Sequence, residues 1–236
     1  MRSLIVTAMF LASIACAAAD DYEEPRDLAI DANGIETLTI NVGAGSLYVE
    51  GVEGLDSIEV KATIVIPDED DDDARKIIEK NLTLSLDSGN GEAVLKSEFD
   101  QGFWGSGSSG RVDLEVRAPS TLAVSIDDGS GSMEVANFSA EVRIDDGSGS
   151  IDVQQVGTLN IDDGSGSIDI SGANGDVYVN DGSGSITIEA VTGTVTIDDG
   201  SGSIRVTDVA EDLIIVDDGS GSISFSDIRG AVEQEG

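Results

Sequence analysis

Hydrophobic residues in the second half of the chain alternate with polar ones in short runs, and the runs come in pairs. An apolar-x-apolar triplet follows each Gly-Ser-Gly-Ser stretch, as in Ile151–Val153 and Ile168–Ile170. A second triplet, such as Leu159–Ile161, precedes the next Asp-Asp. β-Branched residues with a period of two are typical of half-buried strands, and the helical spacing of i, i+3 and i+4 is missing. The pattern predicts two short strands and two turns in every repeat.

The repeat has a nearly fixed length. The heptapeptide Ile-Asp-Asp-Gly-Ser-Gly-Ser or a near copy occurs six times, and its first glycines are 18, 17, 18, 18 and 19 residues apart. They are Gly129, Gly147, Gly164, Gly182, Gly200 and Gly219. A lone apolar residue often lies between the triplets, at Phe138, Val156, Val191, Val209 and Ile228. A fixed period in this range is the signature of a solenoid.

The two turns of each repeat differ, and this difference selects the topology. One turn is always Asp-Asp-Gly-Ser-Gly-Ser, whereas the other varies. Identical turns once per coil favour parallel stacking over a meander of hairpins, which is the structural alternative. The rule for parallel crossovers favours a right-handed coil. We therefore predict an all-β fold, a right-handed parallel β-helix (β-solenoid) with coils of about 18 residues.

The first half of the chain follows the same pattern more loosely. Ile40–Val49 keeps both glycines and an apolar-x-apolar pair, whereas Leu86–Gly91 keeps the turn but loses the phase. Between them an acidic run, 68–73, precedes Ala74, Ile77 and Ile78, and it predicts a short helix near residues 70–80. A cation-binding patch is the other interpretation of this run. The predicted organisation is a lead segment at 20–34 and one solenoid domain at 35–236, irregular over 35–110 and regular over 111–236.

Residues 1–19 have the features of a secretory signal peptide. Arg2 is followed by an apolar stretch and by Ala17–Ala19, a small-residue cleavage site. The apolar stretch is too short to span a membrane, and no other run in the sequence approaches that length. The alternative is a lipoprotein signal in which Cys16 is acylated, although Ser13 stands where such signals usually have Leu. We expect an exported protein, in the periplasm or at the cell surface, free or tethered by a lipid.

Composition excludes several classes of function. The chain of 236 residues has 47 Asp and Glu against 12 Lys and Arg, a net charge of -35. So acidic a chain is a poor ligand for nucleic acid or for an anionic membrane surface. Histidine is absent and Cys16 is the single cysteine, which excludes His-dependent nucleophiles, His-ligated metals and thiolate cages. Aromatic residues are only 4%, so the core must be aliphatic.

A resemblance to a known family rests on the repeat and on the strands before it. Val112–Pro119 leads into Leu122–Ile126, and Gly-Ser-Gly-Ser-apolar-x-apolar units follow. Over about residues 35–233 this pattern resembles the bacterial "putative adhesin" family of exported β-helix proteins. The resemblance implies an envelope protein with no established catalytic residues. The doubled Asp before almost every Gly departs from a generic member of that family.

The sequence is compatible with three classes of function. An enzyme, such as a polysaccharide lyase or hydrolase, is the least favoured, because an active site is singular whereas the Asp pairs recur in every repeat. A non-catalytic envelope scaffold or adhesin-like module is favoured, with an envelope protein or polysaccharide as partner. An uncapped last coil also predicts weak end-to-end self-association. Divalent-cation or glycan binding on the turns is the alternative.

The Asp pairs and one aromatic cluster provide the candidate site residues. Stacked coils bring the second Asp of each pair into one column, about 4.8 Å apart, where like charges repel. Either Asx-turn hydrogen bonds and solvent offset this repulsion, or calcium bridges the coils. The candidate metal ligands are Asp128, Asp146, Asp163, Asp181, Asp199 and Asp218. Phe103 and Trp104 are candidate partner-binding residues, with packing against the solenoid as the competing interpretation.

Overall fold

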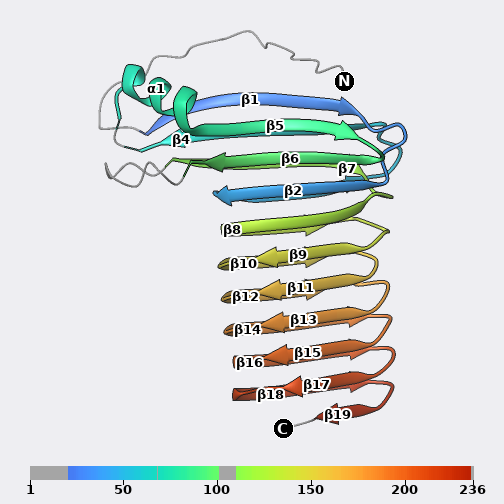
Figure 1. The fold of residues 1–236 in the computed structure, drawn as a ribbon. Helices are drawn as coiled ribbons and strands as arrows, with labels where there is room; N and C mark the ends of the chain where they lie inside the picture. Colours follow the sequence, from blue (N-terminus) through green and yellow to red (C-terminus); the bar gives the residue numbers. More distant parts are fainter. Residues whose placement is uncertain (1–20, 68, 101–109, 235–236) are drawn as a thin grey trace.

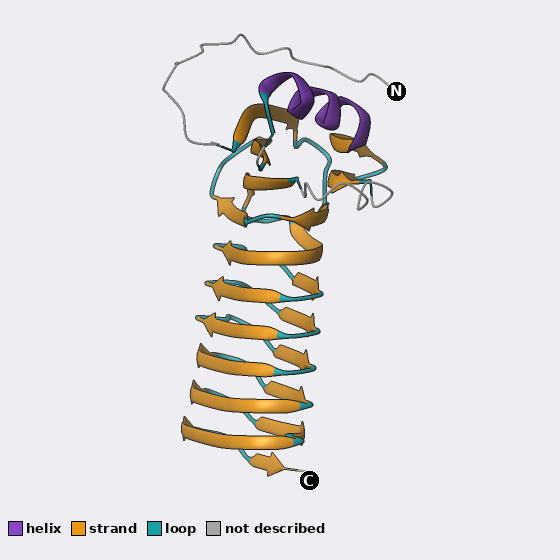
Figure 2. Ribbon diagram, turned by 90° about the vertical axis from the view of Figure 1, so that its left-hand side faces the viewer, coloured by secondary structure: helices purple, strands orange, loops and turns teal. Residues whose placement is uncertain are grey.

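The computed structural model describes residues 21–67, 69–100 and 110–234, and it is a β-solenoid of about six turns with one short helix. The predicted signal peptide at 1–19, Cys16, Phe103 and Trp104 lie outside these residues. Two parallel sheets run the length of the stack (Figures 1 and 2). Among the described residues, no helix combines the length and the apolar character needed to cross a membrane.

Each regular coil contributes one strand to each sheet. The first sheet contains β10 (Gly149–Gln154), β12 (Gly166–Ser171), β14 (Gly184–Val191), β16 (Ser201–Val209) and β18 (Ser220–Ile228). The second contains β9 (Val142–Asp146), β11 (Leu159–Asp163), β13 (Val177–Asp181), β15 (Val195–Asp199), β17 (Leu213–Asp217) and β19 (Val232–Gln234). All these strands pair in parallel with their neighbours in the stack. This pairing confirms the solenoid and excludes the meander.

The apolar positions form columns along the axis of the stack. Ile151, Ile168 and Ile186 are in register in the first sheet, and all are buried. The lone apolar residues predicted between the strands are also buried at Phe138, Val156, Val191 and Val209, while Ile228 is half-buried. Ala173, which the sequence pattern did not single out, fills the gap in that column. The core is therefore aliphatic, as the composition requires, with Phe138 buried among the aliphatic side chains.

The N-terminal region contains one true coil, formed by its second and third strands. β2 (Thr37–Ala44) and β3 (Leu47–Val52) pair in parallel with the two halves of β8 (Ala123–Ala136), which runs through the Asp-Asp corner and belongs to both sheets. Ile40–Val49 thus forms the degenerate repeat that the sequence predicted. β7 (Arg111–Pro119) pairs in parallel with β3, and Val112–Val116 is a strand as expected.

Antiparallel strands complete this region, and they lie outside the repeat pattern. β4 (Ser57–Ile66) pairs antiparallel with β7 and with β1 (Tyr22–Asp31), so the lead segment at 20–34 contains a strand that extends the first sheet. β5 (Leu82–Gly89) and β6 (Glu92–Phe99) form a hairpin on the second sheet. Its turn residues Asn90 and Gly91 both have positive φ, 54° and 82°, as a type I′ turn requires. The turn at Leu86–Gly91 therefore closes a hairpin, and the prediction of a degenerate coil turn there was wrong.

The predicted helix is α1 (Asp71–Asn81), which lies at the N-terminal end of the stack (Figure 2). The Asp70 carboxylate accepts hydrogen bonds from the backbone N–H groups of Asp72 and Asp73, at 3.1 and 3.0 Å. Ala74 and Ile78 are buried on its inner face. The acidic run thus acts as the helix cap and first turn, where carboxylates are favourable.

The opposite end of the stack is different. Beyond β18 and β19 no described strand pairs with the last coil, and Val216, Phe225 and Val232 are 40%, 48% and 40% exposed. An extra residue shifts the register between β15 and β17, so Asp217 pairs with Asp198. The repeat pattern placed Val216 at the inward Ile position, but Ile215 pairs with Ile197 and is buried instead.

Candidate functional site

The Asp-Asp-Gly-Ser-Gly corner joins the second sheet to the first in every regular coil. Its backbone packs so closely against the next coil that a side chain is excluded at the second glycine. Gly149, Gly166 and Gly184 have φ of 150–154°, and a Cβ on each would overlap the carbonyl oxygen of the equivalent glycine one coil away. Only glycine adopts this conformation freely. The corner is consequently a rigid frame that fixes the direction of the two preceding Asp side chains.

The second Asp of each pair points into the solenoid. It continues the alternation of the strand, since Asp163 lies two residues after the buried Ile161 and four after the buried Leu159. Five such carboxylates form the column that we call the inner Asp column, with exposed fractions of 4%, 3%, 2%, 1% and 1%. They are Asp128, Asp146, Asp163, Asp181 and Asp199. Asp218, after the register shift, is only half-buried.

Every member of the inner Asp column makes the same hydrogen bond. Its Oδ1 accepts the backbone N–H of the serine two residues on, at 2.9–3.3 Å. The Asx-turn interpretation of these residues is therefore confirmed in all five coils. The accompanying expectation that solvent screens their charges was wrong, because the carboxylates lie inside the stack.

Burial and like charge act together on this column. In-register members are one coil apart, a spacing of about 4.8 Å, and two full charges at that distance repel by about 3 kcal/mol at an effective dielectric of 20. Burial, with the repulsion of Asp146 next in size, raises the pKa of Asp128 to about 7. Burial together with Asp163 and Asp199 raises the pKa of Asp181 to about 6. The pKa values of Asp146, Asp163 and Asp199 are raised for the same primary reason, loss of solvation.

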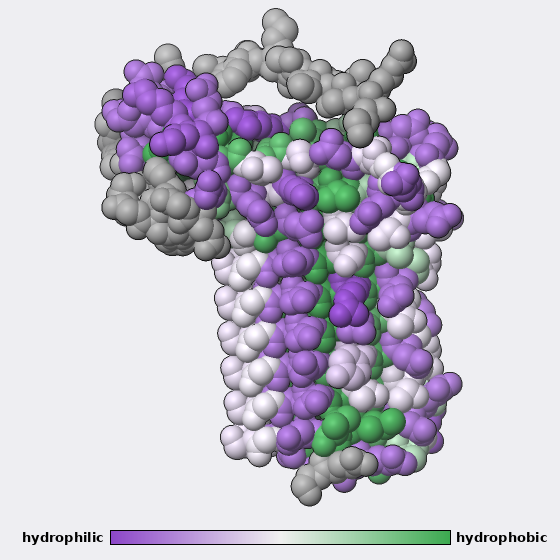
Figure 3. All heavy atoms as spheres, viewed as in Figure 1, coloured by the Kyte–Doolittle hydropathy of each residue, from purple (hydrophilic) through white to green (hydrophobic). Residues whose placement is uncertain are grey.

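The first Asp of each pair faces solvent and forms the outer Asp column. Asp127, Asp145 and Asp162 are exposed, and Asp198 is half-exposed. Asn180 interrupts this column, and its side-chain N–H₂ donates to Asp162 Oδ1 at 3.3 Å. The substitution of amide for acid thus replaces one repulsive neighbour by a hydrogen bond. Hydrophilic residues form a continuous stripe along the coils beside a paler stripe (Figure 3).

The structure does not gather the candidate metal ligands into a cation site. No group of three or more acidic, histidine or cysteine residues with a geometry suited to a metal ion occurs in the described ranges 21–67, 69–100 and 110–234. The six acids proposed as calcium ligands instead lie one per coil, and the side chains of five of them are buried inside the stack. A calcium site of several carboxylates needs a convergent set of oxygens.

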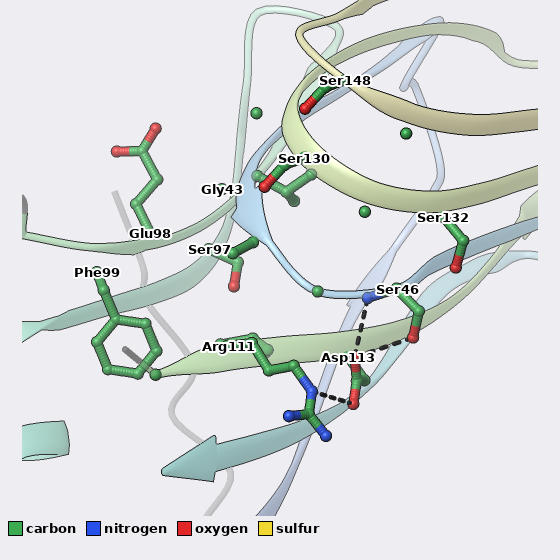
Figure 4. Close-up of a pocket in the computed structure, with 18 of the residues that line it drawn as sticks. Gly43, Ser46, Ser97, Glu98, Phe99, Arg111, Asp113, Ser130, Ser132 and Ser148 are labelled. Atoms are coloured by element: carbon green, nitrogen blue, oxygen red, sulfur yellow. Dashed lines mark hydrogen bonds and ion pairs between the residues drawn. The ribbon is translucent and has the colours of Figure 1, made fainter. Parts of the chain in front are cut away.

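A groove of about 1200 Å³ lies beside the first coils, where β6, β7 and the β2–β3 corner meet β8 and β10 (Figure 4). Sequence reasoning missed it, because its walls come from segments far apart in the chain. Asp113 holds one wall: its Oδ1 accepts from the Ser46 N–H at 2.9 Å and from the Ser46 hydroxyl at 3.0 Å. Ser97 lines the groove, is 4% exposed, and its hydroxyl has no hydrogen-bond partner.

Fold and corners together define an acidic β-solenoid that presents one repeated corner along its length. No family model matches the chain, and no curated protein matches it. Solved structures resemble it only distantly. A protein named "putative lipid binding protein" from Parabacteroides distasonis has 13% identity and a TM-score of 0.43, over 91% of this chain and 94% of the other.

Two further neighbours carry adhesion names. A "putative adhesin" from Bacteroides fragilis has 12% identity and a TM-score of 0.39, over 92% of this chain and 99% of its own. A "putative cell adhesion protein" from Clostridium sporogenes has 12% identity and a TM-score of 0.34, over 92% and 100%. At such scores the names of these neighbours assign no function to this chain.

Proposed function

We propose that this protein is a non-catalytic, exported cell-envelope protein, a scaffold or adhesin-like rod that binds an envelope protein or polysaccharide through its acidic corner. The observation that carries the proposal is the outer Asp column, which places Asp127, Asp145, Asp162 and Asp198 at the same corner of successive coils, with Asn180 as the one interruption among them. A repeated surface suits an extended partner, whereas a catalytic centre is built once. Export rests on the signal-peptide features of residues 1–19.

A binding experiment with two matched variants tests this proposal. D145N/D162N/D198N removes three charges from the outer Asp column, whereas D152N/D169N/E189Q removes three from the exposed face of the first sheet. The mature chain and both variants are immobilised, and retention of envelope protein and of purified envelope polysaccharide is measured. We expect the column variant to lose at least tenfold in retention and the face variant to keep it. Equal retention by all three chains would exclude the corner as the binding surface.

Glycan binding is a second candidate function, and the groove favours it. Serine hydroxyls and carboxylates line the groove, among them the exposed side chains of Asp127 and Ser132. Polar groups of this kind pair with the hydroxyls of a sugar chain. Ser148→Phe places a ring in the groove, and Ser183→Phe places the same ring at the equivalent corner two coils away. Titration with envelope polysaccharide should fail for the first variant only; unchanged binding by both would remove this candidate.

Weak self-association through the C-terminal coil is a further part of the proposal. The exposed Val216, Phe225 and Val232 belong to the last coil, and no further described strand pairs with the edges of β18 and β19. The N-terminal end is closed by α1 and by antiparallel strands, so two copies would meet tail to tail. Sedimentation of the full chain should show concentration-dependent association that Phe225→Lys abolishes. A strict monomer at high concentration and moderate salt would exclude this contact.

A further inference from the structure

Several carboxylate oxygens inside the solenoid are buried without a hydrogen-bond partner. Each member of the inner Asp column uses Oδ1 for its serine N–H group. The second oxygen, Oδ2, is fully buried and unpartnered in Asp128, Asp163 and Asp181. A buried carboxylate oxygen without a hydrogen bond is costly, so a group that pairs with it is expected.

The stacking of the coils places these oxygens in one file. Asp128 is in register with Asp146, Asp146 with Asp163, Asp163 with Asp181, and Asp181 with Asp199. The file is closed at its N-terminal end, because Val42 of β2 pairs with Asp128. At the other end the register shift leaves Asp218 half-buried. Each carboxyl group of the file therefore has the carboxyl group of an adjacent coil as an in-register neighbour.

In the part of the chain that the structure describes, no Lys or Arg forms an ion pair with a member of the column. The charged side chains that contribute most to the raised pKa values of its members are carboxylates: the members themselves and Asp127, Asp145, Asp162, Asp198, Asp217 and Asp218. The described residues also provide no convergent set of ligands for a metal ion. A proton is the one cation that needs no such set, because a single carboxyl oxygen binds it.

We propose that the inner Asp column is a proton-binding site, in which some of the carboxyl groups are neutral and donate hydrogen bonds from Oδ2–H to carboxyl oxygens of adjacent coils. A proton taken from solvent forms the O–H bond, and the neighbouring carboxylate accepts the hydrogen bond. Each shared proton removes one repulsion between coils and satisfies two buried oxygens. Hydrogen bonds between side chains then join adjacent coils, in addition to the backbone hydrogen bonds of the sheets.

The direction of the pKa shifts agrees with this arrangement. Burial, the largest cause in every case, raises the pKa of all five carboxyls, to about 7 for Asp128 and about 6 for Asp181. A group whose folded pKa is raised holds its proton more tightly in the folded chain than in the unfolded one. Folding near pH 6 therefore takes up protons, and the bound protons are lost as the pH rises through the folded pKa values.

The test is a titration of the full chain labelled with ¹³C at the Asp carboxyl carbons. We expect a group of resonances with midpoints raised above the ordinary value for an aspartate, those of Asp128 and Asp181 near pH 7 and pH 6, together with the infrared band of neutral carboxyl groups at pH 6. D146N/D163N/D181N should lose most of this group, and D145N/D162N/D198N should keep it. Where the inner triple variant fails to fold, Asp163→Asn alone should remove one member and shift its neighbours.

Two results would overturn the proposal. One is a wild-type chain in which every Asp resonance titrates below pH 5 while the chain stays folded. The other is a high-midpoint group that persists in the inner variants and disappears in the outer one, which would place the bound protons on the surface.

Discussion

The two aspartates of each Asp-Asp pair are neighbours in sequence, yet they meet opposite environments. Asp162 faces water and belongs to a surface column, whereas Asp163 is 2% exposed and accepts a hydrogen bond from the Ser165 N–H at 3.1 Å. The cause is the period-two alternation of the strand, which reverses the side-chain direction at every residue. One dipeptide therefore supplies both the buried hydrogen-bond acceptor of the corner and the charged surface beside it.

The largest effect should come from a side chain added at the corner that follows the two aspartates. In Gly166→Ala the new Cβ would overlap the carbonyl oxygen of Gly149, and the backbone has a φ of 152° that alanine rarely adopts. We expect a loss of about 3 kcal/mol or more in the free energy of unfolding, from overpacking and backbone strain combined. Urea unfolding followed by circular dichroism measures it. Ser167→Ala, at the next and exposed position, should change stability by less than about 0.5 kcal/mol.

Replacing Asn180, which interrupts the outer Asp column, by an aspartate should have a smaller effect on stability. Asn180→Asp removes the hydrogen bond to Asp162 and places a third charge between Asp162 and Asp198. Two new repulsions of about 1 kcal/mol each in water predict a loss of about 1–2 kcal/mol at low salt. Most of the loss should disappear in 0.5 M sodium chloride, because exposed charges are screened. A loss that is insensitive to salt would mean that this column is not solvated.

A gain of stability is expected at the corner that follows the first sheet. Asn137, Gln155, Ala190, Asp208 and Asp227 all have positive φ there, and Gly172 is the one glycine in this column. Ala190, at φ 60°, has no side chain that offsets the strain of this conformation. Ala190→Gly should raise the free energy of unfolding by about 0.5–1 kcal/mol. An equal loss of stability would show that the backbone there is unstrained.

The smallest effect should be that of calcium. The inner carboxylates are buried and the described residues contain no convergent ligand set, so of the two columns only the outer one is open to calcium. Millimolar calcium should therefore raise the melting temperature no more than sodium chloride of matched ionic strength. A clearly larger rise with calcium would restore the cation bridge between coils as an explanation of the Asp repeats.

Much of the regular half could be predicted because its coils repeat one local pattern. The triplets gave the strands, the glycine spacing gave the coil, and the lone apolar positions gave a third buried column. The inward direction of Asp163 was also predictable, since it extends the alternation of Leu159 and Ile161 by one step. This direction was missed because acidic residues are expected to stay in solvent. The positive φ at the corner after the first sheet could not be predicted from the sequence, because five different residue types occupy that position.

The N-terminal half was less predictable for a different reason. β1 pairs with β4, and β4 pairs with β7, although these strands are far apart in the sequence. Antiparallel pairs of this kind leave no periodic pattern in the sequence from which they could be predicted. The hairpin at Asn90–Gly91 did carry a local signal, an Asn-Gly turn between alternating residues. The similarity of Leu86–Gly91 to the repeat obscured it. The groove that contains Ser97 requires the folded arrangement of five strands and could not be predicted from any one of them.

The most direct test of the difference between the two columns is the free energy of unfolding of Asp163→Asn and Asp162→Asn, each relative to the unsubstituted chain, from pH 4 to pH 8. High salt, 0.5 M sodium chloride, suppresses the general repulsion of so acidic a chain. The raised pKa of Asp163 means that its contribution to stability is present at pH 4 and lost as the pH rises through that value. Asp163→Asn keeps an oxygen for the Ser165 N–H and has no proton to lose. It should therefore gain stability relative to the unsubstituted chain as the pH rises, by about 1–3 kcal/mol at pH 8. Asp162→Asn should differ little from the unsubstituted chain at any pH. Equal pH dependence in the two variants would contradict the division of each Asp pair into an inner and an outer role.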